Sequence, residues 1–213
     1  SIEAIHRRFE AELSLDAHFS GNGGDGIFCS VRSAVPLLDR FLAEGLRPPL
    51  AATIRDIGTV TGANDMAVLR HAWSRCRRNR GQHVPRFDAA GLHGGLVAEL
   101  EEEGPTHPWL QSDSSVLPGK TVHATYLMRT HKSIELYPRA EAPPHVAPLH
   151  AQPIVELCLS IPTWMWIAEG RNRAVARKAF EGWLPPLIAR RTSKGGPGDF
   201  HLLIYREHRE SLH

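Results

Sequence analysis

The stretch Ser20-Gly21-Asn22-Gly23-Gly24-Asp25-Gly26 decides how this chain is interpreted. Its glycines and one carboxylate lie between a short apolar segment, a candidate strand over residues 17–20, and a helix-like segment over residues 27–42. Glycine tolerates positive φ and lets a ligand approach the backbone closely. Such a turn can present N–H groups to an anion, and Asp25 can hold a Mg²⁺ that bridges phosphate oxygens. The alternative interpretation is a tight loop with a capping aspartate.

The composition predicts a globular protein of one domain. The chain has 213 residues, of which 23% are charged and 42% hydrophobic, and its formal net charge is +2. This charge gives no general argument for nucleic-acid binding, and no apolar run reaches the ~18 residues of a membrane span. Cys29, Cys76 and Cys158 are far apart and odd in number, which indicates free thiols in a reducing compartment. We therefore expect a cytoplasmic protein with no nucleic-acid or membrane partner.

Helical periodicity dominates the rest of the chain, and strands are expected to be few and short. Apolar spacing predicts helices over residues 2–13, 31–46, 50–60, 64–78, 96–103, 121–137, 153–161, 171–183 and 200–211. Trp164 and Trp166 are expected to pack in the core rather than stack on a nucleotide. The arginine-rich run from Arg70 to Arg80 is either the solvated end of a helix or a patch for an acidic peptide or a phosphate.

A second glycine-rich loop, Ser193-Lys194-Gly195-Gly196-Pro197-Gly198, carries a lysine. A carboxylate that binds a metal and a lysine on flexible glycines are groups that the activation of a carboxylate as an acyl-adenylate needs. Negative charge builds on the pyrophosphate and on the tetrahedral intermediate of that reaction, and a fixed ammonium stabilises both. A lysine on a loop is more often a solvated surface residue. This loop therefore indicates a site only in combination with the glycine loop at residues 20–26.

Several segments, in order along nearly the whole chain, resemble the C-terminal synthetase domain of asparagine synthetase-like proteins. They are residues 19–28, Ala147-Pro148-Leu149, residues 173–177 and residues 184–195. Within that group the chain is most similar to the bacterial lasso peptide cyclases. The segments that carry this closer likeness are residues 23–29, His107-Pro108-Trp109, Leu117-Pro118-Gly119-Lys120, Ile161-Pro162-Thr163-Trp164 and residues 191–195.

The resemblance implies an α/β domain of the adenine nucleotide alpha hydrolase-like type that uses ATP and Mg²⁺, of which this stretch is the predominantly α-helical part. It implies that Asp25 binds the metal and that Lys194 is the catalytic residue that stabilises the intermediate. It further implies that the nucleotide is contacted by Gly21, Gly23, Gly24, Arg173 and Gly195.

The implied activity is ATP-dependent amide formation by adenylation of a side-chain carboxylate. Lasso cyclases adenylate an Asp or Glu of a precursor peptide, whose N-terminal amine then closes a macrolactam ring while AMP and pyrophosphate leave. The implied partners are this peptide, a leader-binding protein and a leader peptidase. Two alternatives stay open: an asparagine synthetase, which adds ammonia to adenylated aspartate, and a non-catalytic scaffold or peptide-binding relative.

The chain departs from the family pattern in three ways. The family's first ATP loop, Ser-Gly-Gly-x-Asp-Ser, is not among residues 1–213, so we expect them to be the C-terminal part of a longer domain and inactive in isolation. Asn22 stands where asparagine-forming and β-lactam-forming relatives carry Glu or Tyr, and an amide cannot act as a base. The glutamate that those enzymes use falls near Pro144. Asn22 thus argues against an asparagine synthetase, whereas intramolecular amine attack gains a proximity effect of up to roughly 7–11 kcal/mol.

Overall fold

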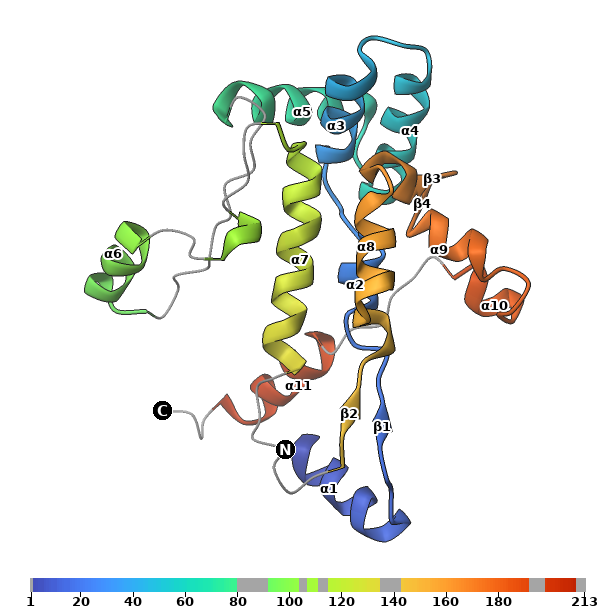
Figure 1. Cartoon of the computed structure of the whole chain (residues 1–213). Helices are drawn as coiled ribbons and strands as arrows, with labels where there is room; N and C mark the ends of the chain where they lie inside the picture. The colour runs from blue at the N-terminus through green and yellow to red at the C-terminus, as the bar shows by residue number, and fades with distance from the viewer. Residues whose placement is uncertain are drawn as a thin grey trace. The chain divides into compact units, whose positions relative to one another are not determined.

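The computed structural model describes residues 2–79, 92–103, 107–110, 115–134, 143–191 and 198–209, and these are mainly helical (Figure 1). The chain divides into two compact units, Ser1–Ala176 and Arg177–His213. In the described part of the chain the strands are short and few, as the sequence predicts.

Helices make up most of the first unit. They are α1 (Ile2–Leu13), α2 (Gly24–Ile27), α3 (Val35–Glu44), α4 (Pro49–Thr61), α5 (Asp65–Asn79), α6 (Gly94–Glu103), α7 (Pro118–Ile134) and α8 (Gln152–Ser160), with α9 (Ala174–Ala179) across the unit boundary. Single 3₁₀ turns are η1 (Pro108–Leu110), η2 (Pro148–His150) and η3 (Thr163–Trp166). These bounds agree with most of the helices that the apolar spacing predicts.

Two strand pairs complete this unit. β1 (His18–Phe19) pairs in parallel with β2 (His145–Val146), so that the segment before the first glycine loop lies beside the segment before η2. β3 (Ile167–Ala168) pairs antiparallel with β4 (Arg171–Asn172). Both pairs are therefore placed next to the residues of the predicted site.

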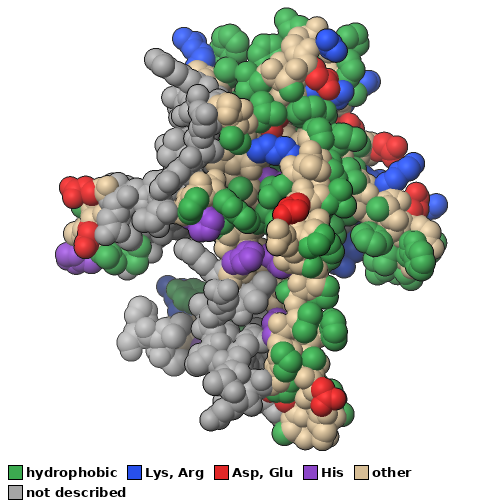
Figure 2. Space-filling view, viewed as in Figure 1, with side chains coloured by type: hydrophobic (Ala, Val, Ile, Leu, Met, Phe, Trp, Pro, Cys, Tyr) green, Lys and Arg blue, Asp and Glu red, His purple; other side chains and the backbone are tan. Residues whose placement is uncertain are grey.

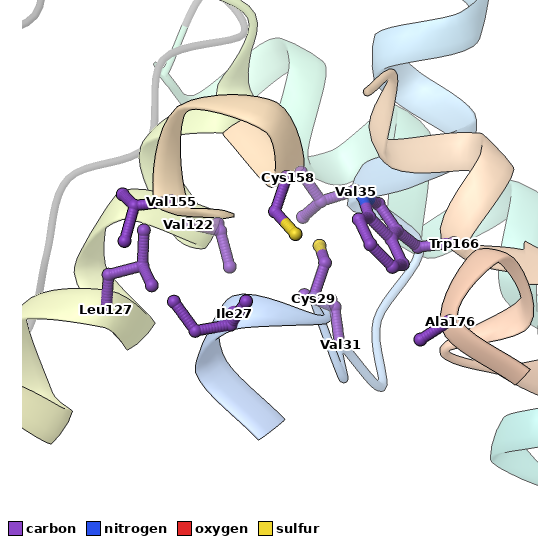
Figure 3. Close-up of a cluster of buried hydrophobic side chains, with 10 residues drawn as sticks. All are labelled: Ile27, Cys29, Val31, Val35, Val122, Leu127, Val155, Cys158, Trp166 and Ala176. Carbon is purple, nitrogen blue, oxygen red and sulfur yellow. The ribbon is translucent and has the colours of Figure 1, made fainter. Parts of the chain in front are cut away.

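The main hydrophobic core joins α2, α7, α8 and η3. Ile27, Leu127 and Trp166 are almost completely buried in it, and the Sγ atoms of Cys29 and Cys158 face one another (Figure 3). The prediction that Trp166 packs in the core is confirmed. Because α2 directly follows the glycine loop, this core fixes one end of the loop.

A second cluster of buried side chains joins α3, α4 and α5. Its members are Ala34, Leu37, Ile57, Val68, Ala72 and Ile167. Asn64 caps the start of α5, because Ala67 N donates to Asn64 Oδ1 at 2.8 Å.

The predicted helix over residues 27–42 is wrong in its first part. The chain leaves α2 after Ile27, and Cys29 adopts a left-handed φ of 47°. Val31 N donates to Cys29 O at 2.7 Å, which closes a tight turn. α3 begins only at Val35, with Pro36 in its first turn, where a proline costs no intrahelical hydrogen bond. The glycine loop thus leads into a four-residue helix and offers no long-helix N-terminus to an anion.

The predicted basic helix over residues 171–183 is too long at both ends, because only α9, Ala174–Ala179, is helical within it. Residues 171–172 form β4, and the turn between β3 and β4 consists of Glu169 and Gly170, with φ of 53° and 66°. Two left-handed residues are typical of a two-residue hairpin turn. Gly170 N donates to Asp56 Oδ1 at 2.8 Å, so a contact with α4 that local periodicity cannot reveal holds this hairpin.

The second unit contains α10 (Pro186–Ala189) and α11 (Gly198–Glu207). Arg177 Nη1 donates to Ala189 O at 2.9 Å and ties α10 to the start of the unit. Trp183 and Leu187 are 86% and 84% exposed, and hydrophobic side chains gather on the surface over α10 (Figure 2). None of the described helices of either unit has the length and apolar character to cross a membrane.

Candidate functional site

The glycine loop is a tight turn closed by its own backbone. Gly23 takes a left-handed φ of 88°, and Ile27 N donates to Gly23 O at 2.9 Å. Gly24 N donates to Gly21 O at 3.3 Å, and Asn22 N donates to Ser20 Oγ at 3.0 Å. This geometry places Asp25 in the first turn of α2, with a side chain that is 41% exposed. Its carboxylate is therefore within reach of a ligand.

Arg173 and Asp25 form an ion pair across 148 residues of sequence. Arg173 Nη1 donates to Asp25 Oδ1 at 2.7 Å, and the arginine side chain is 26% exposed. Arg173 follows β4 and has a left-handed φ of 54°, which is a strained conformation for a non-glycine residue. The structure thus brings together two residues that the sequence assigned to the metal and to the nucleotide, and it places them beside Gly23 and Gly24.

Close packing explains why glycine is needed at position 23 of this loop. A Cβ built on Gly23 would lie 1.7 Å from His150 Nε2, and one on Gly24 would lie 3.3 Å from Leu149 Cδ1. A Cβ on Gly21, by contrast, would meet nothing within 4 Å. Gly23 is therefore required by its left-handed φ and by the ring of His150, whatever ligand the loop binds.

His150 is the site residue that the sequence analysis missed. Its Nδ1 lies 3.2 Å from His131 Nε2 on α7, and the two rings are edge to face with centroids 4.8 Å apart. Burial, and then the nearby His131, lowers the pKa of His150 below its usual value, so the ring is held neutral. The only signal in the sequence is that His150 directly follows the family-like motif Ala147-Pro148-Leu149.

A buried polar group supports the core behind the site. Asp39 is fully buried, and its Oδ1 accepts from Gly119 N at 2.7 Å while its Oδ2 accepts from Thr163 Oγ1 at 2.6 Å. Burial outweighs these hydrogen bonds and raises the pKa of Asp39 to about 6. Lys120 Nζ donates to the carbonyl oxygens of Leu159 and Ile161, and burial lowers its pKa. These groups join α3, α7 and η3 and do not border the glycine loop's ion pair.

A buried histidine holds the far end of α2. His123 on α7 is fully buried, and its Nε2 donates to Ile27 O at 2.9 Å. Burial lowers the pKa of His123, which keeps the ring neutral in the core. The contact satisfies a backbone carbonyl at the end of a short helix, and it fixes the position of the segment that carries Asp25.

The remaining predicted site residues are not tested by the structure. Lys194 and Gly195 lie within residues 192–197, outside the described residues, and their roles stay predictions. Among the described residues, no group of three or more His, Cys, Asp or Glu side chains is arranged to hold a metal ion. A Mg²⁺ at Asp25 would therefore need phosphate oxygens and water as further ligands. That composition fits this cation, which commonly takes one or two carboxylates with substrate phosphates.

Fold and site together define a mainly helical protein with a glycine-rich loop and a carboxylate–arginine pair. The chain belongs to the asparagine synthase family, whose model matches residues 5–212. No curated protein and no solved structure matches it. The family is thus shown over nearly the whole chain, and with it the class of ATP-dependent amidation.

Proposed function

We propose that the protein closes a macrolactam ring in a precursor peptide, using ATP to activate a side-chain carboxylate of that peptide. In the first step the carboxylate oxygen attacks the α-phosphorus of ATP, which forms an acyl-adenylate and releases pyrophosphate. In the second step the peptide's N-terminal amine attacks the acyl carbon and loses a proton, and AMP leaves. The adenine nucleotide alpha hydrolase-like fold and a Mg²⁺ requirement belong to this proposal.

The observation that carries the proposal is the Arg173–Asp25 ion pair at the glycine loop of an asparagine synthase family chain. A guanidinium forms paired hydrogen bonds with phosphate oxygens, which suits Arg173 to pyrophosphate. Gly21, Gly23 and Gly24 precede Asp25 in this loop and are proposed to contact the nucleotide. A Mg²⁺ bound at Asp25 would supply positive charge to the departing pyrophosphate. Lys194 is proposed to stabilise the tetrahedral intermediate, and Gly195 to give its loop freedom.

Ring closure is proposed over ammonia transfer because of Asn22 and the cyclase-like segments. Asn22 is exposed at the tip of the loop, and an amide there offers no base to deprotonate an attacking ammonia. An amine already tethered to the activated carboxylate needs less assistance, because orientation replaces part of the barrier. The proposed partners are accordingly the precursor peptide, a leader-binding protein and a leader peptidase.

The full-length protein, as its gene encodes it, provides the test. With ATP, Mg²⁺ and short peptides encoded beside its gene, we expect pyrophosphate release and a peptide product lighter by one water. Asp25→Asn should abolish the Mg²⁺-dependent release, and Lys194→Ala should abolish amide formation without loss of fold. Lys178→Ala, on the exposed face of α9, is the matched control for Lys194→Ala and should retain activity.

Two outcomes would replace the proposal. Formation of asparagine from aspartate and ammonium, without a peptide product, would assign the protein to the asparagine synthetases. Binding of a peptide with no ATP turnover at all would assign it to non-catalytic scaffolds. A neighbouring gene for a small leader-binding protein is the genomic arrangement that ring closure requires.

A further inference from the structure

A cavity of about 490 Å³ opens between the chain before α3, the end of α4, and α5. Its base is apolar, because Ala34, Ile57 and Val68 are all buried members of the second core cluster. These residues belong to the first unit, and the described residues that line the cavity include neither a residue of the glycine loop nor Arg173. The cavity is therefore a separate feature, for which the proposed chemistry gives no use.

The mouth of this cavity is basic. Arg32, Arg70 and His71 line it with exposed side chains, and no Asp or Glu is among the described residues that line it. Within the described part of the chain neither arginine makes an ion pair. Two unpaired guanidinium groups over an apolar base favour a ligand with a carboxylate on a short hydrocarbon stem.

The outer face of α5 extends this basic mouth with apolar side chains. Met66 and Trp73 are 72% and 63% exposed, and they stand four residues before and three residues after Arg70. Residues at these spacings share one helix face, so Arg70 lies between two exposed apolar groups. Arg77, also exposed, follows Trp73 by four residues and continues the face. Alternating cations and apolar groups are complementary to a peptide that alternates acidic and apolar residues.

We propose that this cavity binds a glutamate or aspartate side chain of a peptide, with Arg32 and Arg70 pairing with the carboxylate. Met66 and Trp73 contact the apolar residues on either side of that acidic residue. That this peptide is the precursor substrate rests on the function proposed above. The proposal adopts the acidic-peptide interpretation of the arginine run, of which Arg70 lines the cavity. A nucleic acid fits less well, because the net charge of the chain is only +2.

Binding of a synthetic peptide in the absence of ATP tests this site. The probe is fluorescein-labelled Gly-Glu-Leu-Gly-Glu-Leu-Gly, compared with the same peptide carrying glutamine for glutamate, by fluorescence anisotropy of the full-length protein at low salt. We expect the glutamate peptide to bind about tenfold more tightly. The double variant Arg32→Gln, Arg70→Gln should lose this preference, whereas Arg47→Gln, an exposed arginine outside the cavity, should keep it.

Three results would overturn the proposal: equal affinity for the two peptides, an equal loss in the Arg47→Gln control, or displacement of the peptide by inorganic phosphate or an oligouridine at lower concentration than by unlabelled peptide. Thermal unfolding followed by circular dichroism shows whether the variants keep their fold. The function itself is tested separately, by pyrophosphate release in wild type and Asp25→Asn. Absent release with retained peptide preference rejects the function alone, and retained release with equal peptide affinities rejects the cavity alone.

Discussion

Arg173 donates from Nη1 to Asp25 Oδ1 at 2.7 Å, so the two opposite charges of the proposed nucleotide site neutralise one another in the ligand-free protein. Their side chains are half-buried rather than enclosed, which limits the strength of the pair by solvent screening. A weak pair of this kind can exchange partners. Under the proposed function, the carboxylate would exchange the guanidinium for Mg²⁺, and the guanidinium would exchange the carboxylate for phosphate oxygens of the nucleotide.

The first prediction follows from that exchange. Arg173→Gln should weaken binding of Mg²⁺·ATP to the full-length protein about tenfold, because a charge-assisted contact with phosphate is lost. Isothermal titration calorimetry measures this change. Arg171→Gln is the matched control: this arginine is exposed, only two residues away on β4, and its loss should leave the affinity unchanged. Equal weakening by both variants would mean that general charge, and not the pair, determines binding.

The second prediction concerns Gly23. Gly23→Ala should lower the free energy of unfolding by about 1–3 kcal/mol, because alanine is strained at a φ of 88° and its Cβ would overlap the His150 ring. Urea denaturation measures the effect. Gly21→Ala, whose Cβ would meet nothing, should be nearly neutral.

A double variant separates the two causes. In the His150→Ala background, the added Cβ of Gly23→Ala no longer overlaps a ring, but the backbone strain at residue 23 remains. Gly23→Ala should therefore lower the free energy of unfolding by less in this background than in wild type, but not by zero. A cost of zero in the His150→Ala background would show that the left-handed φ contributes nothing. A cost equal to that in wild type would show that overlap with the His150 ring contributes nothing.

Local patterns in the sequence predicted most helices because each has its own apolar periodicity and boundaries. They failed at residues 28–34 and at residues 171–172, where tertiary contacts decide the backbone. Asp56 on α4 accepts from Gly170 N and holds a hairpin where periodicity alone predicts a helix. In the first of these segments, Cys29 is buried in the core and has a left-handed φ, which its intrinsic propensity does not predict.

The candidate site was predictable as residue identities but not as geometry. Asp25 and Arg173 were both named from the family-like motifs, yet nothing in either local sequence states that they touch across 148 residues. His150 was not predicted, because no local pattern around η2 indicates that its ring lies against Gly23. Asp39 escaped for a similar reason, since its partners Gly119 and Thr163 come from two distant elements.

The third prediction concerns the cysteines. In the folded protein iodoacetamide should modify Cys76, which is partly exposed, long before Cys29 and Cys158. Burial raises the pKa of Cys29 to about 12 and also raises that of Cys158, so neither supplies the reactive thiolate near neutral pH. Peptide mapping by mass spectrometry before and after denaturation gives the modification of each position. Labelling of Cys29 as fast as Cys76 in the native state would contradict the buried core shown in Figure 3.

The fourth prediction concerns the pH dependence of stability, and it depends on Asp39. Burial raises the pKa of this carboxyl to about 6, against the opposing effects of Thr163, Gly119 and Lys120. The unfolded chain has an ordinary aspartate pKa of about 3.9. Between these two values the folded protein binds a proton that the unfolded chain has released. The stabilising contribution of Asp39 is therefore fully present below pH ~4 and is lost as the pH rises through about 6.

Chemical denaturation of wild type and Asp39→Asn at several pH values between 4 and 7 isolates this effect. The free energy of unfolding of wild type, minus that of Asp39→Asn, should rise on the order of 1–3 kcal/mol as the pH falls from 7 to 4. Asp16→Asn, at an exposed position, is the control for the removal of one carboxylate. A difference for Asp39→Asn that does not change with pH would mean that the Asp39 carboxyl titrates alike in both states. The network of Gly119 and Thr163 would then have to offset its burial completely.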